Sequence, residues 1–168
     1  MTAARQKQKR RRIPRIGGRL AGLILLAPWL AVPPAAALTE RIVANWHTGL
    51  AMDGYDPVGY FTDQKPVPGN ADFEAYYAGV VWRFSNPGNR AAFLERPDIY
   101  MPQFGGYDPI GVVLGRAVAG SVDVWLIVGT RLYLFHDEGH REKFVADMER
   151  LLAEAERQWP SVLHTLSP

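Results

Sequence analysis

Two histidines, His136 and His140, are the residues of this chain whose type and spacing best fit a chemical role. The first precedes a predicted helix and the second falls in its first turn, so their rings can converge at the helix N-terminus. Imidazole is a good ligand for zinc, copper or nickel. Asp108, in a turn of the same half of the chain, could add a carboxylate. The three residues predict a divalent-metal site, and the alternative is a solvated histidine pair that binds nothing.

Five aromatic side chains form a second candidate site. A cleft lined by them, between the two halves of the chain, would bind a small molecule or another protein without a metal. Tyr and Trp also serve as core residues whose polar tip reaches a hydrogen-bond partner, and this alternative stays open for each of them. The residues are Tyr55, Tyr60, Trp82, Tyr100 and Tyr107.

Catalytic motifs are missing from the sequence. It contains no nucleophile elbow, no phosphate-cradling glycine loop and no His-Glu-x-x-His. Nothing in the sequence puts a base beside Ser85 or Ser121. An enzyme that uses a tyrosine and a carboxylate stays a third function class, but the sequence favours a binding module over a catalyst.

The first 37 residues are typical of an export signal. A stretch rich in Lys and Arg precedes the apolar run Leu20–Val32, and Ala35 and Ala37 are small residues that a signal peptidase accepts. The run is about 13 residues long and contains Pro28, whereas a membrane-spanning helix needs roughly 20 residues. We expect cleavage after Ala37 and a periplasmic or secreted protein, with an uncleaved anchor as the alternative.

Removal of this leader would reverse the net charge. Of 19 Lys and Arg residues in the chain, eight precede Glu40, so 11 remain against 17 Asp and Glu, a net charge of −6 instead of +2. An acidic domain is a poor partner for nucleic acid, and the membrane is a partner only through an uncleaved leader. Without cysteine the chain forms neither a disulfide nor a lipid-anchored thiol. Arg11-Arg12 leaves both the general secretory and the twin-arginine routes open.

The remaining chain predicts hairpins followed by helices. Residues 73–85 are aromatic and β-branched around a central Ala-Gly, which is typical of a β-hairpin. Asn86 then caps, and Pro87 begins, a short helix. Residues 122–135 predict a second hairpin around Gly-Thr, and apolar residues at helical spacing predict a long amphipathic helix over residues 137–159.

These two stretches align with each other. Trp82, Phe84 and Phe93 have aromatic counterparts 51 residues later, and the GYDP of residues 54–57 returns at 106–109. We therefore expect an α+β fold of two similar hairpin-plus-helix units packed as one small domain over residues 38–160, followed by a tail. Internal duplication and two ordinary αβ units are both compatible with this pattern.

The segments DPVGYF and AYYAGVVWRFSNPGNRAAFLERPDIYMPQFGGYDP resemble the YHS-domain family in its exported bacterial form, a signal peptide followed by one domain. The resemblance covers residues 53–159. Short metal-associated members carry cysteines that bind soft metals, and the matching positions here are Gly59, Ser85 and Asn89. None of these supplies a thiolate, so the resemblance implies that the first half has lost this chemistry.

The second half differs, because FHDEGHREKF has the framework of the family's cysteine-containing segment with His136 and His140 at the two cysteine positions. Exported members usually carry GGYC where this chain has Asp108, which removes a thiol. The resemblance therefore implies an exported binding module whose metal, such as zinc or copper, would bind in the second half.

Export gives the first testable prediction. Mass spectrometry of the periplasmic or culture fraction should find a mature N-terminus near Leu38, because cleavage is expected after Ala37. Recovery of only the full-length chain, in the membrane fraction, would contradict this expectation.

Overall fold

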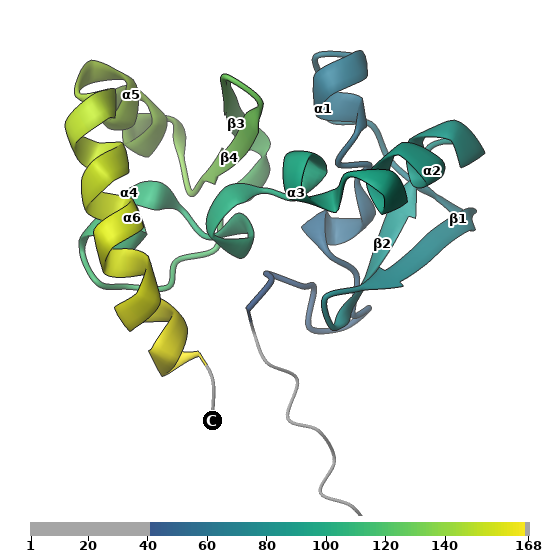
Figure 1. Ribbon diagram of the computed structural model, residues 1–168, viewed down its shortest axis with the longest axis horizontal. Helices are drawn as coiled ribbons and strands as arrows, with labels where there is room; N and C mark the ends of the chain where they lie inside the picture. Colours follow the sequence, from purple (N-terminus) through teal and green to yellow (C-terminus); the bar gives the residue numbers. More distant parts are fainter. Residues whose placement is uncertain (1–40, 167–168) are drawn as a thin grey trace, which may run out of the picture. The chain divides into compact units, whose positions relative to one another are not determined.

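The computed structural model describes residues 41–166 (Figure 1). The expected leader and its cleavage site lie outside these residues, as do the last two residues of the expected tail. Within the described part, no helix is long and apolar enough to span a bilayer.

The first half consists of a tight turn, a short helix, a β-hairpin and two helices. Its strands form a two-stranded antiparallel sheet. The elements are the 3₁₀ turn η1 (Met52–Gly54), α1 (Gly59–Thr62), β1 (Asn70–Tyr77), β2 (Val80–Phe84), α2 (Pro87–Glu95) and α3 (Pro97–Tyr100).

The second half repeats this order of elements. Its strands form a second two-stranded antiparallel sheet, and the longest helix of the described chain follows. The α+β class and both hairpins are therefore confirmed. The elements are η2 (Gln103–Gly106), α4 (Pro109–Val113), β3 (Ser121–Val128), β4 (Arg131–Phe135), α5 (Glu138–Ala146) and α6 (Met148–Thr165).

The single helix expected over residues 137–159 is wrong in its bounds. Two helices occupy this stretch, because Asp147 leaves the helical region with φ −146° and ψ 50°. The same break, at Arg96 with φ −135° and ψ 62°, separates α2 from α3. At its other end α6 runs through Pro160 into the expected tail, since Val162 beyond the proline is still buried.

Local geometry also agrees between the halves. In each hairpin the pairing register shifts once, between Asn70 and Glu74 in β1 and between Ser121 and Trp125 in β3. These bulges lie 51 residues apart, as do α2 and α5. This agreement favours internal duplication, which stays a hypothesis.

Aromatic contacts between strand and helix form the core of each half. Phe93 of α2 lies with its ring centroid 5.0 Å from that of Trp82 and 5.1 Å from that of Phe84. Phe144 of α5 lies 5.2 Å from Phe135 in the same manner. Strand β4 connects the two clusters, because Leu132 and Leu134 pack with the first and its aromatic residues with the second.

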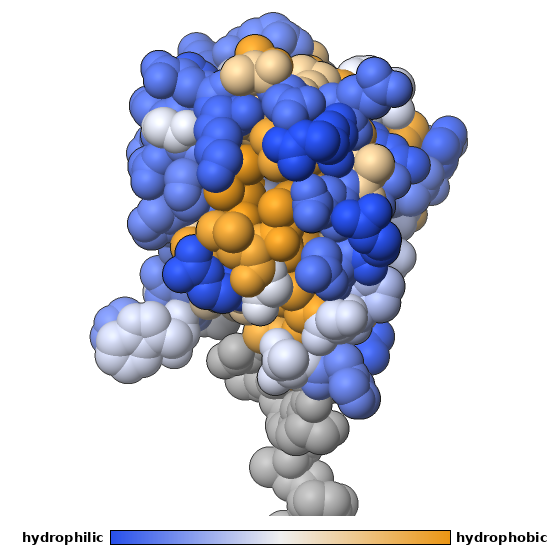
Figure 2. Space-filling view, turned by 90° about the vertical axis from the view of Figure 1, so that its left-hand side faces the viewer, coloured by the Kyte–Doolittle hydropathy of each residue, from blue (hydrophilic) through white to orange (hydrophobic). Residues whose placement is uncertain are grey.

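On the side of α5 and α6 an apolar strip is bordered by hydrophilic side chains (Figure 2). Leu114, which ends α4, and Val145 of α5 are each 52% exposed in this half of the chain. These exposed positions contrast with the fully buried Phe144 next to Val145, so the helix has one face in the core and one in water.

The core assignment predicts large losses of stability. Phe93→Ala and Phe144→Ala should each lower the free energy of unfolding by about 3 to 5 kcal/mol, because both rings are fully buried. The neighbouring substitutions Leu94→Ala and Val145→Ala are matched controls, since these side chains are 48% and 52% exposed. Urea denaturation would measure all four, and equal losses for buried and exposed positions would contradict the assignment.

Candidate functional site

A fully buried aspartate follows the tight turn of each half. The backbone N–H of Asp56 donates to the carbonyl of Val67 at 2.8 Å, and that of Asp108 donates to the carbonyl of Val118 at 2.8 Å. Neither carboxylate pairs with a Lys or Arg in the part of the chain that the structure describes. Each must therefore be stabilised by hydrogen bonds alone or by a histidine.

In the first half, neutral donors surround Asp56. One carboxylate oxygen accepts the N–H of Val58 at 2.9 Å, as expected for an Asx turn. The other accepts the N–H and hydroxyl of Ser85 at 2.8 and 2.7 Å and the amide of Asn89 at 2.7 Å. Ser85 and Asn89, near the N-terminus of α2, therefore both donate hydrogen bonds to this carboxylate.

In the second half, Asp108 caps the short helix α4. Its oxygens accept the N–H groups of Ile110 and Gly111, both at 3.2 Å. The oxygen bound to Gly111 also contacts Nδ1 of His140. His140 is the residue 51 positions after Asn89 and occupies the equivalent place, so an imidazole replaces an amide as the partner of the buried carboxylate.

His136 and His140 lie on the same side of the α5 N-terminus, with ring centroids 6.2 Å apart. Nδ1 of His136 is 3.3 Å from the carbonyl oxygen of Ala119. A carbonyl and a carboxylate only accept hydrogen bonds, so each neutral imidazole carries its proton on Nδ1. Within residues 41–166 neither Nε2 has a hydrogen-bond partner, which leaves both Nε2 lone pairs free.

The role expected for Asp108 needs correction. Its carboxylate is already engaged with two helix N–H groups and His140 Nδ1, and it is fully buried, so it orients the imidazole instead of facing a metal. Residues 41–166 contain no group of three His, Cys, Asp or Glu side chains placed to hold one ion. Two imidazoles, without the carboxylate, are what the site offers as ligands.

A second carboxylate, that of Asp137, stabilises the first turn of α5. Asp137 caps α5 by accepting the N–H of His140 at 2.8 Å. This hydrogen bond is the main reason why the pKa of Asp137 lies below its usual value. The ionised carboxylate also complements the positive end of the α5 dipole.

The five aromatic residues do not converge on one cleft. Tyr60 and Trp82 are fully buried in the first core cluster, where Tyr60 Oη donates to the Val122 carbonyl at 2.8 Å. Burial is the main cause that raises the pKa of this hydroxyl. Tyr55 and Tyr100 pack against the same cluster, and Tyr107 belongs to the other. Tyr60 and Trp82 thus fit the alternative interpretation, in which an aromatic residue lies in the core and its polar tip makes a hydrogen bond.

Sequence reasoning missed the segment that leads into the first half. Residues 43–46 line two cavities, of about 230 and 450 Å³. In the sequence this segment offered only Trp46 and a histidine without an evident partner. Its role depends on contacts with distant residues, such as the hydrogen bond from Val43 N to the carbonyl of Gly105, 62 positions later, at 2.8 Å.

No family model, curated protein or solved structure matches this chain in the three comparisons made. The resemblance to the YHS-domain family therefore stays a prediction based on the quoted motifs.

The lowered pKa of Asp137 predicts an acid-dependent contribution to stability. A carboxyl whose pKa is depressed on folding stabilises the fold above its unfolded value of 3.8, and this stabilisation disappears as pH falls through the folded value. Asn can cap the helix at every pH. The melting temperature of the wild type should therefore exceed that of Asp137→Asn at pH 7, and the difference should shrink below pH 4.

Asn86 occupies the equivalent cap of α2, so Asn86→Asp is the reciprocal variant. It should introduce the same acid sensitivity in the first half. A melting-temperature difference for Asp137→Asn that is constant between pH 7 and pH 3 would refute the role of this carboxylate.

Proposed function

We propose that this chain is an exported YHS-like binding module that binds a borderline divalent metal, zinc or copper, through the Nε2 atoms of His136 and His140. The observation that carries the proposal is that both Nδ1 atoms face an acceptor, the Asp108 carboxylate for His140 and the Ala119 carbonyl for His136. Metal-binding histidines in proteins typically donate their second ring N–H in this way, which fixes the tautomer and directs the other nitrogen at the metal.

The contrast between the halves supports the choice of site. Ser85 and Asn89 lie at the positions equivalent to the two histidines, but their polar atoms are held by Asp56 and neither is a good metal ligand. In the second half the buried carboxylate engages one residue of the pair through Nδ1 alone, and both Nε2 atoms stay available. At these equivalent positions, the first half therefore has polar atoms engaged in structural hydrogen bonds, and the second half has ring nitrogens that can bind a metal.

Two imidazoles fill only part of a metal's coordination shell. Zinc in proteins prefers four ligands, so water or a group from another molecule would complete the shell. The positive end of the α5 dipole disfavours a cation, and the carboxylates of Asp108 and Asp137 offset this effect. Such a site suits reversible uptake and transfer of a metal better than permanent storage.

Calorimetric titration of the full-length protein with zinc and copper tests the proposal. The wild type should bind one ion, and His136→Ala and His140→Asn should each abolish the heat of binding. His140→Asn is chosen because it copies the Asn89 arrangement and keeps a donor for the buried carboxylate. Binding requires neutral imidazoles, so the affinity should fall as the solution is made more acidic.

Three further variants distinguish a specific site from incidental metal binding by exposed histidines. His47→Ala and His164→Ala, at exposed positions outside the site, should leave the affinity unchanged. Asp108→Asn, in a variant shown by its melting curve to be folded, should weaken binding by about 10 to 100-fold because the imidazole loses its orienting partner. Equal heats for the wild type, His136→Ala and His140→Asn would overturn the proposal.

A further inference from the structure

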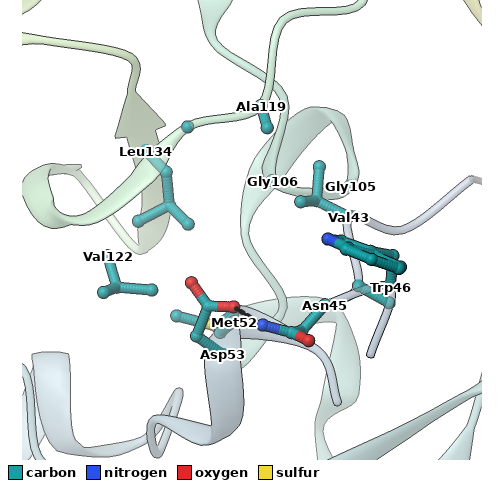
Figure 3. A pocket seen from close by; sticks show the side chains of 12 residues that line it. Val43, Asn45, Trp46, Met52, Asp53, Gly105, Gly106, Ala119, Val122 and Leu134 are labelled. Atoms are coloured by element: carbon teal, nitrogen blue, oxygen red, sulfur yellow. Dashed lines mark hydrogen bonds between the residues drawn. The ribbon is translucent and has the colours of Figure 1, made fainter. Parts of the chain in front are cut away.

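A cavity of about 230 Å³ lies between the two tight turns of the domain. Met52 and Asp53 of η1 line one side, and Gly105 and Gly106 of η2 line the other (Figure 3). Val122 and Leu134 add an apolar wall. Each half therefore contributes its turn to the same cavity, but only the first contributes a charged side chain.

The backbone at Asp53 takes a conformation that favours glycine. Its φ is 51° and ψ is 22°, in the left-handed region, and Met52 before it has φ 51°. The equivalent residue of the second half is Gly105, with φ 63°, where an added Cβ would lie 1.9 Å from the Arg41 carbonyl oxygen. Aspartate tolerates this conformation better than most non-glycine residues, because its short polar side chain can hydrogen-bond locally.

The Asp53 carboxylate has room for a further partner. One oxygen accepts a hydrogen bond from the Asn45 amide at 2.9 Å, and the other points into the cavity toward the apolar wall (Figure 3). Asn45 is neutral, and no basic side chain of residues 41–166 pairs with Asp53. A carboxylate that faces a cavity without a counter-ion attracts a cation.

Trp46 completes the site. Its side chain is 86% exposed. The backbone around it is ordered by Asn45, whose Oδ1 accepts the N–H groups of His47 and Thr48 at 3.0 and 3.1 Å. Asn45 therefore hydrogen-bonds both to the backbone that follows Trp46 and to the Asp53 carboxylate. The indole lies at the edge of the cavity (Figure 3), where its ring contacts the His47 imidazole with centroids 3.2 Å apart. An indole face that stays open to solvent attracts cations.

We infer that this cavity binds a small primary ammonium ion with a short alkyl chain. The ammonium group donates to the free oxygen of Asp53 and lies near the indole of Trp46, while the alkyl chain contacts Val122 and Leu134. The volume excludes a peptide or a nucleotide, because ligand pockets for such molecules are larger. Neither His136 nor His140 lines this cavity, although Ala119, whose carbonyl oxygen contacts His136, does. The inference does not depend on metal binding.

The test is calorimetric or saturation-transfer NMR titration of the full-length protein with n-butylammonium chloride. The wild type should bind n-butylammonium and should bind neither n-butanol nor butyrate with comparable affinity. Asp53→Asn should lower the affinity about tenfold or more, because a charge-assisted hydrogen bond is replaced by a neutral one. Asn also tolerates the left-handed conformation, so this variant should keep the wild-type melting temperature.

Trp46→Ala should weaken binding by about threefold to thirtyfold, the range for a cation over an indole. Asp72→Asn, at an exposed carboxylate outside the cavity, is the matched control and should bind like the wild type. Absence of n-butylammonium binding by the wild type would overturn the inference. Equal affinity of wild type and Asp53→Asn, or equal binding of n-butanol, would overturn it as well.

Discussion

Burial of one carboxylate in each half is the constraint on which the rest of this structure depends. Asp56 and Asp108 are both fully buried, and a charge removed from water is costly unless donors surround it. Meeting this requirement brings together the turn that carries the aspartate, the N–H groups of the next helical turn and the first residues of the helix after the hairpin. The end of each hairpin is thereby held to the turn.

The two halves meet this requirement with different chemistry. Serine and asparagine satisfy Asp56 with three hydrogen bonds from neutral groups, so no polar atom of the pair is left over for a ligand. Asp108 engages the imidazole of His140, whose side chain is 31% exposed and whose second nitrogen is free. The same buried carboxylate thus serves a purely structural role in one half and, in the other, orients a partly exposed imidazole. Our functional proposal rests on this difference.

Much of the fold could be predicted from local sequence, because β-branched and aromatic runs, Asn86 and the GYDP turns each specify structure over a few residues. The break at Asp147 could not, since the apolar periodicity that defines a helix continues through it. The burial of Tyr60 and Trp82 was open, because a strand or helix pattern does not say which aromatic face is covered. The contact between Asp108 and His140 joins residues 32 positions apart, and spacing alone suggested a shared metal, not a carboxylate that orients a ligand.

The tautomer of His140 tests this arrangement most directly. In a long-range ¹H–¹⁵N spectrum of the imidazole groups, recorded above pH 8 so that the rings are neutral, His140 should carry its proton on Nδ1, and Nε2 should have the shift of an unprotonated ring nitrogen. His164, an exposed histidine outside the site, provides the reference for an unconstrained ring. A His140 ring protonated on Nε2 would mean that Asp108 does not hold it, and would contradict the basis of the proposed metal site.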